Sequence, residues 1–180
     1  LLLSFLDLPH EWVHINILAG DTKKPEFLAR NPNGKIPLLE LADGRCLSVS
    51  NAILNYLAAG SAYLPADVFL LAKVQQWQFF EQYSHEPYIA VARYIAKYLG
   101  LPEQRRAEYE SKQAGGRKAL SVMESQLSKT PFLVGNTLTT ADIALYGYTH
   151  VAHEGGFDLA PYSSIRRWLD RIKAQPGYVG

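Results

Sequence analysis

The sequence contains very little cysteine and no long apolar run. Cys46 is the only cysteine among 180 residues, so an intramolecular disulfide is excluded. No apolar stretch approaches the roughly 20 residues that a membrane-spanning helix needs. These two absences favour a cytoplasmic protein that does not associate with a membrane.

The sequence also lacks an excess of charge of either sign. It has 18 Lys and Arg against 17 Asp and Glu, a formal net charge of +1, and no long run of one sign. Electrostatic attraction to nucleic acid or to an anionic membrane is therefore weak, and we expect neither as a partner. With 48% hydrophobic residues the chain can bury a core. Small molecules and other proteins remain as partners.

Residues 1–60 combine helical and strand patterns. In chain order they predict the end of a helix at Leu1–Leu6, a strand at Trp12–Ile17, a short helix from Pro25, a hairpin turning at Asp43–Gly44, and a helix that Ser50 caps and Gly60 closes. This order indicates an α/β unit.

Pro37 interrupts the first strand of the predicted hairpin. Proline donates no backbone N–H, so it marks an edge strand or an irregularity that serves a purpose. Because only about 5–6% of X–Pro bonds in folded proteins are cis, strand physics alone favours a trans proline at an edge.

The pattern changes at residues 61–66. Gly60, Ser61 and Pro65, in and beside this segment, are typical of a linker. We therefore predict domains at residues 1–60 and 67–180, the second entirely helical. Pro87 is expected to kink or break one of its helices. Thr139 and Asp142 have the spacing of a capping box that starts a buried central helix.

Together these motifs resemble the soluble glutathione transferase family. The resemblance rests on "NPNGKIPLLE" and "SNAILNYLA" in the first part, and on "TLTTADIALYGY" and "IRRWLDRIKAQPG" in the second. It implies a thioredoxin-like N-terminal domain, whose first strand is not in this sequence, followed by an all-helical C-terminal domain.

The resemblance also implies a glutathione site. It implies that Pro37 is cis, so that the backbone of Ile36 faces the cysteinyl part of glutathione. Ser50 would bind the γ-glutamyl carboxylate at a helix start, although its alternative role is plain helix capping. Lys35 would lie near the glycyl carboxylate or be simply solvated. Val49 departs from the family, in which many members have Glu or Gln for the γ-glutamyl ammonium.

The group that activates the glutathione thiol is unknown and is expected N-terminal to Leu1. In the family this is a Tyr, Ser or Cys side chain or a backbone group near the first helix. A free thiol has a pKa near 8.5, so holding it as thiolate requires roughly 2.7 kcal/mol for a shift of about two units.

A pocket for the second substrate is predicted from the segment around Pro87. Glu81, Tyr83, His85 and Tyr88 would line it, although core packing or solvation is the favoured explanation for each residue taken singly. No metal site is expected, because the His150 and His153 pair lacks a third ligand.

The sequence thus predicts a glutathione transferase that presents the glutathione thiol to a small hydrophobic electrophile. It needs no cofactor beyond glutathione as co-substrate, and the resemblance implies a homodimer. Two alternatives remain: a non-catalytic relative that binds glutathione or a protein partner, and a glutathione-dependent isomerase or dehalogenase.

Overall fold

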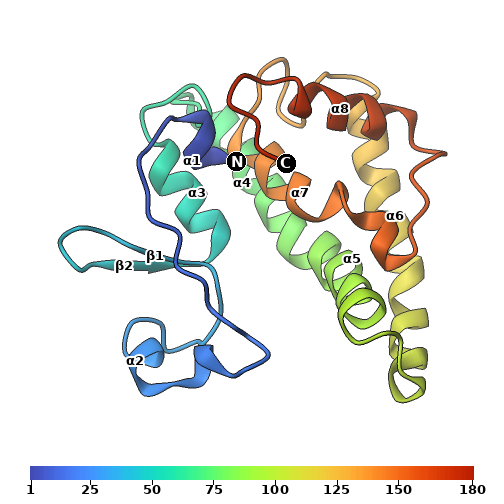
Figure 1. Cartoon of the computed structure of the whole chain (residues 1–180). Helices are drawn as coiled ribbons and strands as arrows, with labels where there is room; N and C mark the ends of the chain where they lie inside the picture. The colour runs from blue at the N-terminus through green and yellow to red at the C-terminus, as the bar shows by residue number, and fades with distance from the viewer.

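A computed structural model describes all 180 residues. A smaller part with a β-hairpin lies beside a larger bundle of helices, and the two chain ends lie next to each other between them (Figure 1). The Ser4 Oγ donates to the Gly177 carbonyl at 2.5 Å, which joins the two ends.

The first part contains one two-stranded antiparallel sheet and short helices. Its elements are α1 (Leu2–Phe5), the 3₁₀ turn η1 (Asp21–Lys23), α2 (Pro25–Leu28), β1 (Leu38–Glu40), β2 (Cys46–Ser48) and α3 (Ser50–Ala58). Leu39 pairs with Leu47 across the sheet. Gly44 supplies the positive φ, 82°, of the predicted turn. The predicted hairpin and helices are confirmed, except that β1 begins after Pro37, which the sequence pattern placed inside the strand.

The strand predicted at Trp12–Ile17 is wrong, because this segment has no regular structure. A strand needs a neighbour for its backbone hydrogen bonds, and β1 and β2 pair only with each other. Three of the four apolar side chains of the segment consequently lie in solvent, with Trp12 83% exposed, and Ile15 is half-buried. Alternation of apolar residues was therefore not sufficient to make a strand here.

The second part is helical throughout, as predicted. Its elements are α4 (Val68–Phe80), the π-helical turn η2 (Glu81–His85), α5 (Glu86–Arg93), the π-helical turn η3 (Tyr94–Tyr98), the 3₁₀ turn η4 (Glu103–Arg105), α6 (Arg106–Leu127), α7 (Thr140–Thr149), the 3₁₀ turn η5 (Ala152–Gly155) and α8 (Ser163–Lys173). The regular α-helix is interrupted just before Pro87, as expected, and the proline lies in the first turn of α5. The wider turn η2 ends at His85, and a proline in the first helical turn costs no hydrogen bond because the N–H groups there have no partner within the helix.

The paired glycines of α6 have a packing role. A Cβ on Gly115 would lie 2.3 Å from the Tyr88 ring, and a Cβ on Gly116 would lie 2.2 Å from the Phe157 ring. Both glycines therefore let α6 approach α5 and the loop after η5 more closely than any side chain would permit. This contact outweighs the low helix propensity of glycine, about 1 kcal/mol per residue.

Helix α7 lies at the centre of the fold. Its predicted capping box at Thr139 and Asp142 is present. Leu145 and Tyr146 of α7 are buried in the main core, together with Trp168 of α8. A smaller cluster of Leu2, Ala58 and Ile143 joins α1 and α3 to α7. The two parts of the chain thus share buried contacts.

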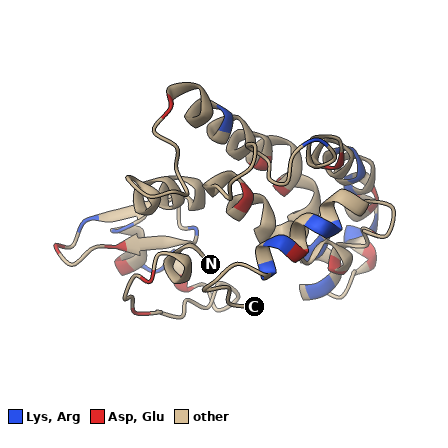
Figure 2. Cartoon of the chain, turned by 90° about the horizontal axis from the view of Figure 1, so that it is seen from above, with Lys and Arg blue, Asp and Glu red and all other residues tan.

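Charged residues of both signs are interspersed over the helices (Figure 2). None of the helices has the length and apolar character that a membrane span requires.

Candidate functional site

The loop before Pro37 is held by a buried asparagine. The Asn31 Nδ2 donates to the Lys35 carbonyl at 2.6 Å, and the Asn33 N–H donates to the Asn31 Oδ1 at 3.2 Å. Gly34 has a φ of +60°, and a Cβ there would lie 3.0 Å from the Thr22 carbonyl oxygen. The "NPNG" sequence therefore fixes the path by which the chain reaches Ile36.

Ile36 presents an unpaired backbone to solvent. The Ile36–Pro37 bond is cis, which confirms the prediction. The N–H and the C=O of Ile36 form none of the hydrogen bonds within the protein. Its side chain is 45% exposed. The donor and the acceptor of this one residue can therefore bind the backbone of a peptide-like ligand, as a paired strand would.

The first turn of α3 offers hydrogen-bond donors beside Ile36. Ser50 is the first helical residue, so the prediction that it caps the helix is wrong: Val49 occupies the cap position, and no side chain caps the turn. The Ser50 hydroxyl and the N–H groups of Ser50, Asn51 and Ala52 have no partner in the protein. Unpaired N–H groups at a helix start favour an anion.

The sheet register brings these two segments together. Leu38 pairs with Ser48 in the antiparallel hairpin. Continuing this register places Pro37 across from Val49 and Ile36 across from Ser50. The Ile36 backbone and the α3 start consequently lie at the same end of the hairpin, where one small ligand can contact both.

Val49 has an unusual backbone conformation. Its φ of 73° and ψ of 115° lie outside the regions that β-branched residues favour. Conformations of this kind cost of order 1–3 kcal/mol and are concentrated at functional sites. The side chain is 49% exposed, so Val49 is not a core residue. The exposed Lys35, which forms no ion pair, completes the set of predicted residues at this end of the hairpin.

A buried polar network connects the start of α3 to α4. The Asn51 Nδ2 donates to the Gln78 carbonyl and to the Glu81 Oε2, both at 3.2 Å. The side chains of Asn55 and Gln78 exchange two hydrogen bonds of 2.8 Å. Burial raises the pKa of the Glu81 carboxyl, against hydrogen bonds from Gln82 and Asn51 that lower it.

Sequence reasoning missed the role of Asn51. Its proximity to Ser50 was a signal, but its partners lie 27 and 30 residues along the chain. The network holds the first turn of α3 against the helical domain, and it thereby fixes the position of the Ser50 hydroxyl.

The structure does not bring the four predicted pocket residues to one surface. Tyr83 is 79% exposed, whereas Glu81 is buried in the network and His85 is fully buried. The Tyr88 ring packs on Gly115. Glu81 and His85 thus contact other protein groups in place of a ligand, because the π-helical turn directs them inward. A pocket at Tyr83 and Tyr88 stays a prediction.

Of the two histidines near the end of α7, His153 is exposed and His150 takes part in packing and a local hydrogen bond. His150 stacks on Tyr146, with ring centroids 4.7 Å apart, and its Nδ1 lies 2.7 Å from the Tyr146 carbonyl oxygen. Glu154 forms ion pairs with Arg93 and Lys97. Glu154 therefore links η5 to α5 and to η3.

The architecture and the site define a class of protein: a thioredoxin-like domain with an unpaired backbone segment at Ile36, joined to an all-helical domain. The sequence profile described as "Glutathione S-transferase, N-terminal domain" matches residues 1–59, and that described as "Glutathione S-transferase, C-terminal domain" matches residues 77–176. The chain belongs to the glutathione S-transferase family.

Two relatives of known structure share the fold, and a third relative is similar in sequence. A glutathione S-transferase from Pseudomonas fluorescens Pf-5 is 60% identical, with a TM-score of 0.98 over 99% of this chain and 89% of that one. A maleylacetoacetate isomerase from a Methylobacterium, whose structure contains malonate and glutathione, is 27% identical, with a TM-score of 0.80 over 98% and 86% of the two chains. Glutathione S-transferase F10 of Arabidopsis thaliana is 33% identical over 93% of this chain and 82% of its own length.

Proposed function

We propose that the protein is a glutathione transferase that binds glutathione at the hairpin end and directs its thiol at a hydrophobic electrophile. The observation that carries this proposal is the unpaired N–H and C=O of Ile36, across the hairpin from an uncapped helix start. Glutathione is a tripeptide, and its cysteinyl N–H and C=O are complementary to the two groups of Ile36. Ser50 and the first N–H groups of α3 then take its γ-glutamyl carboxylate.

Lys35 is assigned to the opposite end of the tripeptide, where its ammonium group suits the glycyl carboxylate. In the reaction the sulfur forms a bond to an electrophilic carbon and a leaving group departs with its electron pair. The protein holds and orients the thiolate, and the helical domain, with Tyr83 and Tyr88 as candidates, holds the second substrate. A direct assay follows chloride displacement from 1-chloro-2,4-dinitrobenzene by glutathione.

The Ser50→Ala variant tests the assignment of the carboxylate site. Loss of one hydrogen bond to a charged group costs roughly 1.5–3 kcal/mol, so we expect glutathione to bind about tenfold more weakly or worse. Calorimetric titration measures this affinity, and Ser111→Ala, at an exposed hydroxyl on α6, serves as the matched control. Equal affinity in Ser50→Ala and wild type would show that the carboxylate binds elsewhere.

The Val49→Glu variant is expected to tighten glutathione binding about tenfold. The new carboxylate would pair with the γ-glutamyl ammonium, which valine leaves without a charged partner. The gain should shrink in high salt, and it should be smaller in Val49→Gln, whose carbonyl oxygen can accept from the ammonium but carries no charge. Because Val49 is exposed, neither variant should lower the melting temperature markedly. An affinity unchanged by Val49→Glu would place the ammonium away from residue 49.

A homodimer is also proposed. Helix α4 and the turn after it expose large apolar side chains, with Val68 81%, Phe69 69%, Phe79 62% and Tyr83 79% accessible. Such a patch on one helix is typical of a protein interface. Sedimentation should show a species near twice the chain mass of 20.1 kDa, and Phe69→Glu should shift it toward the monomer. A wild-type monomer at all concentrations would contradict the proposal.

A second candidate function is a glutathione-dependent isomerase. The fold shared with the maleylacetoacetate isomerase favours it, because the same thiolate can add to a conjugated double bond and then leave. Isomerisation of a cis-diacid without net consumption of glutathione would distinguish it from conjugation. For either activity we propose the cytoplasm, where glutathione is abundant and the single free cysteine stays reduced.

A further inference from the structure

A buried carboxylate without a cation lies next to the proposed glutathione site. Glu81 is 4% exposed, and its Oε2 accepts from the Asn51 Nδ2 at 3.2 Å and from the Gln82 Nε2 at 2.6 Å. Its Oε1 accepts no hydrogen bond within the protein, keeps contact with solvent, and belongs to no ion pair. A carboxylate that is removed from water without a cation is unfavourable. The Oε1 atom is therefore a position where a ligand cation would be stabilised.

Two further side chains with unpaired oxygen atoms lie beside Glu81. Glu86 is the first residue of α5, and Tyr148 belongs to α7, which packs against both η2 and α5. Both residues are half-buried, and neither side chain forms a hydrogen bond or an ion pair. Burial raises the pKa of the Tyr148 hydroxyl, and the negative charges of Glu86 and Glu81 raise it further. The two carboxylates are thus close to this hydroxyl, which stays protonated and presents its oxygen as an acceptor.

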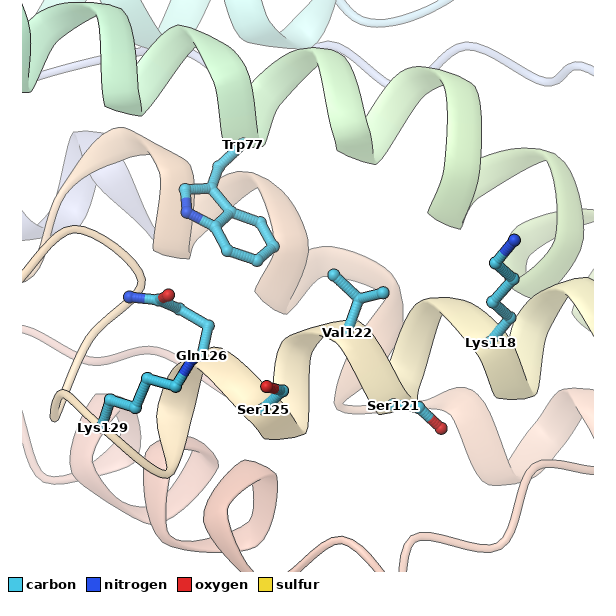
Figure 3. Close-up of a pocket in the computed structure, with 7 residues that line it drawn as sticks. All are labelled: Trp77, Lys118, Ser121, Val122, Ser125, Gln126 and Lys129. Atoms are coloured by element: carbon cyan, nitrogen blue, oxygen red, sulfur yellow. The ribbon is translucent and has the colours of Figure 1, made fainter.

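The space beside Tyr148 is open. Gly147 is exposed, and a Cβ there would have no atom within 4 Å, so this glycine has no packing role within the chain and a ligand can lie against the α7 backbone. Arg93, whose positive charge also acts on Tyr148, is paired with Glu154. The shallow depression between α4 and α6 is lined by two lysines and no acidic side chain (Figure 3), so a cation has no partner there.

We propose that Glu81, Glu86 and Tyr148 bind a primary ammonium group on the second substrate. An ammonium group has three N–H donors, which match the Glu81 Oε1, the Glu86 carboxylate and the Tyr148 hydroxyl oxygen. The apolar body of the substrate lies along α7 at Gly147. This assignment rests on the proposed transferase function, and it narrows the substrate class to an electrophile that carries an alkylammonium group.

The hydrogen bond from Asn51 to Glu81 places this subsite beside the start of α3. A substrate that is held there by its ammonium group consequently lies next to bound glutathione. The ammonium group takes no part in the bond changes: the sulfur forms a bond to the electrophilic carbon, and the leaving group departs with its electron pair. Its contribution is to hold and orient the substrate.

Two substrates of equal shape test the proposal. 4-(Aminomethyl)benzyl chloride and 4-ethylbenzyl chloride differ in the ammonium group, and glutathione displaces chloride from the same benzylic carbon of both. For each substrate, kcat/KM at pH 6.5 is divided by the uncatalysed rate constant, and the ratio of the two quotients is the preference. We expect the wild type to prefer the ammonium substrate about tenfold or more.

Glu81→Gln and Glu86→Gln should each lower this preference about three- to tenfold, and Tyr148→Phe should lower it about twofold. Because the same variant acts on both substrates, a change in its glutathione affinity cancels in the ratio. Glu110→Gln is the matched control, because Glu110 is exposed on α6 and forms no ion pair, and it should leave the preference unchanged. Equal preferences in the wild type, Glu81→Gln and Glu86→Gln would overturn the proposal.

Calorimetric titration with 4-methylbenzylammonium separates this subsite from the transferase function. We expect binding with and without glutathione, which Glu81→Gln and Glu86→Gln weaken and Glu110→Gln does not. Binding of this cation by a protein that displaces chloride from neither substrate would contradict the transferase function and support the subsite. Displacement of the cation by glutathione would show that the three residues take the γ-glutamyl ammonium, and it would overturn the assignment to the second substrate, as would no binding at millimolar ligand.

Discussion

The Asp142→Ala variant should lose about 3–5 kcal/mol of unfolding free energy. Asp142 is fully buried and accepts four hydrogen bonds of 2.8–2.9 Å, from the Leu133 N–H, the Thr139 N–H, the Thr139 hydroxyl and the Trp168 indole. Alanine would leave the two backbone donors and the indole buried without an acceptor, and each such group costs roughly 1–3 kcal/mol. Chemical denaturation followed by circular dichroism measures the loss.

Two further variants make this experiment interpretable. Asp142→Asn keeps the volume and one acceptor oxygen, so we expect an intermediate loss, and it provides a folded protein if the alanine variant does not fold. Asp158→Ala is the matched control, because Asp158 is exposed and accepts one local bond from the Ala160 N–H. A loss below about 1 kcal/mol in Asp142→Ala would show that water satisfies the three donors and that the network does not hold the core together.

Acidification should destabilise the wild type by about 2–3 kcal/mol more than a His85→Gln variant between pH 6.5 and pH 4.5. Burial lowers the pKa of His85 from 6.5 to about 3. Its Nε2 lies 2.9 Å from the Thr149 hydroxyl, which itself donates to the Leu145 carbonyl. The Nε2 is therefore the donor, and the buried Nδ1 has no partner. The native state thus holds a neutral imidazole.

The direction of this pH dependence follows from which state, folded or unfolded, binds the proton of His85. Between the folded pKa near 3 and the unfolded pKa near 6.5 the unfolded chain binds the extra proton, so stability falls as the pH falls, by about 1.4 kcal/mol per unit well below 6.5. Burial raises the pKa values of Glu81 and Asp142, which acts in the opposite direction. Comparison with His85→Gln removes both contributions. Parallel stability profiles for the two proteins would show that His85 is protonated in the folded state or is not buried.

Local chemistry along the chain was sufficient for several elements. Asp43–Gly44 fixed the hairpin, because the turn needs a positive φ at glycine. Thr139 and Asp142 fixed the start of α7, since both members of a capping box lie within one turn. The cis Ile36–Pro37 bond followed from the resemblance to the family, which rests on short contiguous motifs, and not from strand physics, which favours trans. Each of these features depends on residues that are close in sequence.

The tertiary structure decided the features that depend on distant partners. Trp12–Ile17 has strand alternation but no strand beside it, so its hydrogen bonds cannot form. Ser50 is the first helical residue and not the cap, because Val49, with a φ of 73°, occupies the position before the helix.

Gly115–Gly116 is unfavourable to a helix when read locally, and only the rings of Tyr88 and Phe157 show why it is there. The burial of Glu81 and His85 also depends on distant residues. The turn that directs both side chains inward is maintained by contacts with Asn51 and Thr149. These partners lie 30 and 64 residues away along the chain, and periodicity within a helix carries no information about them.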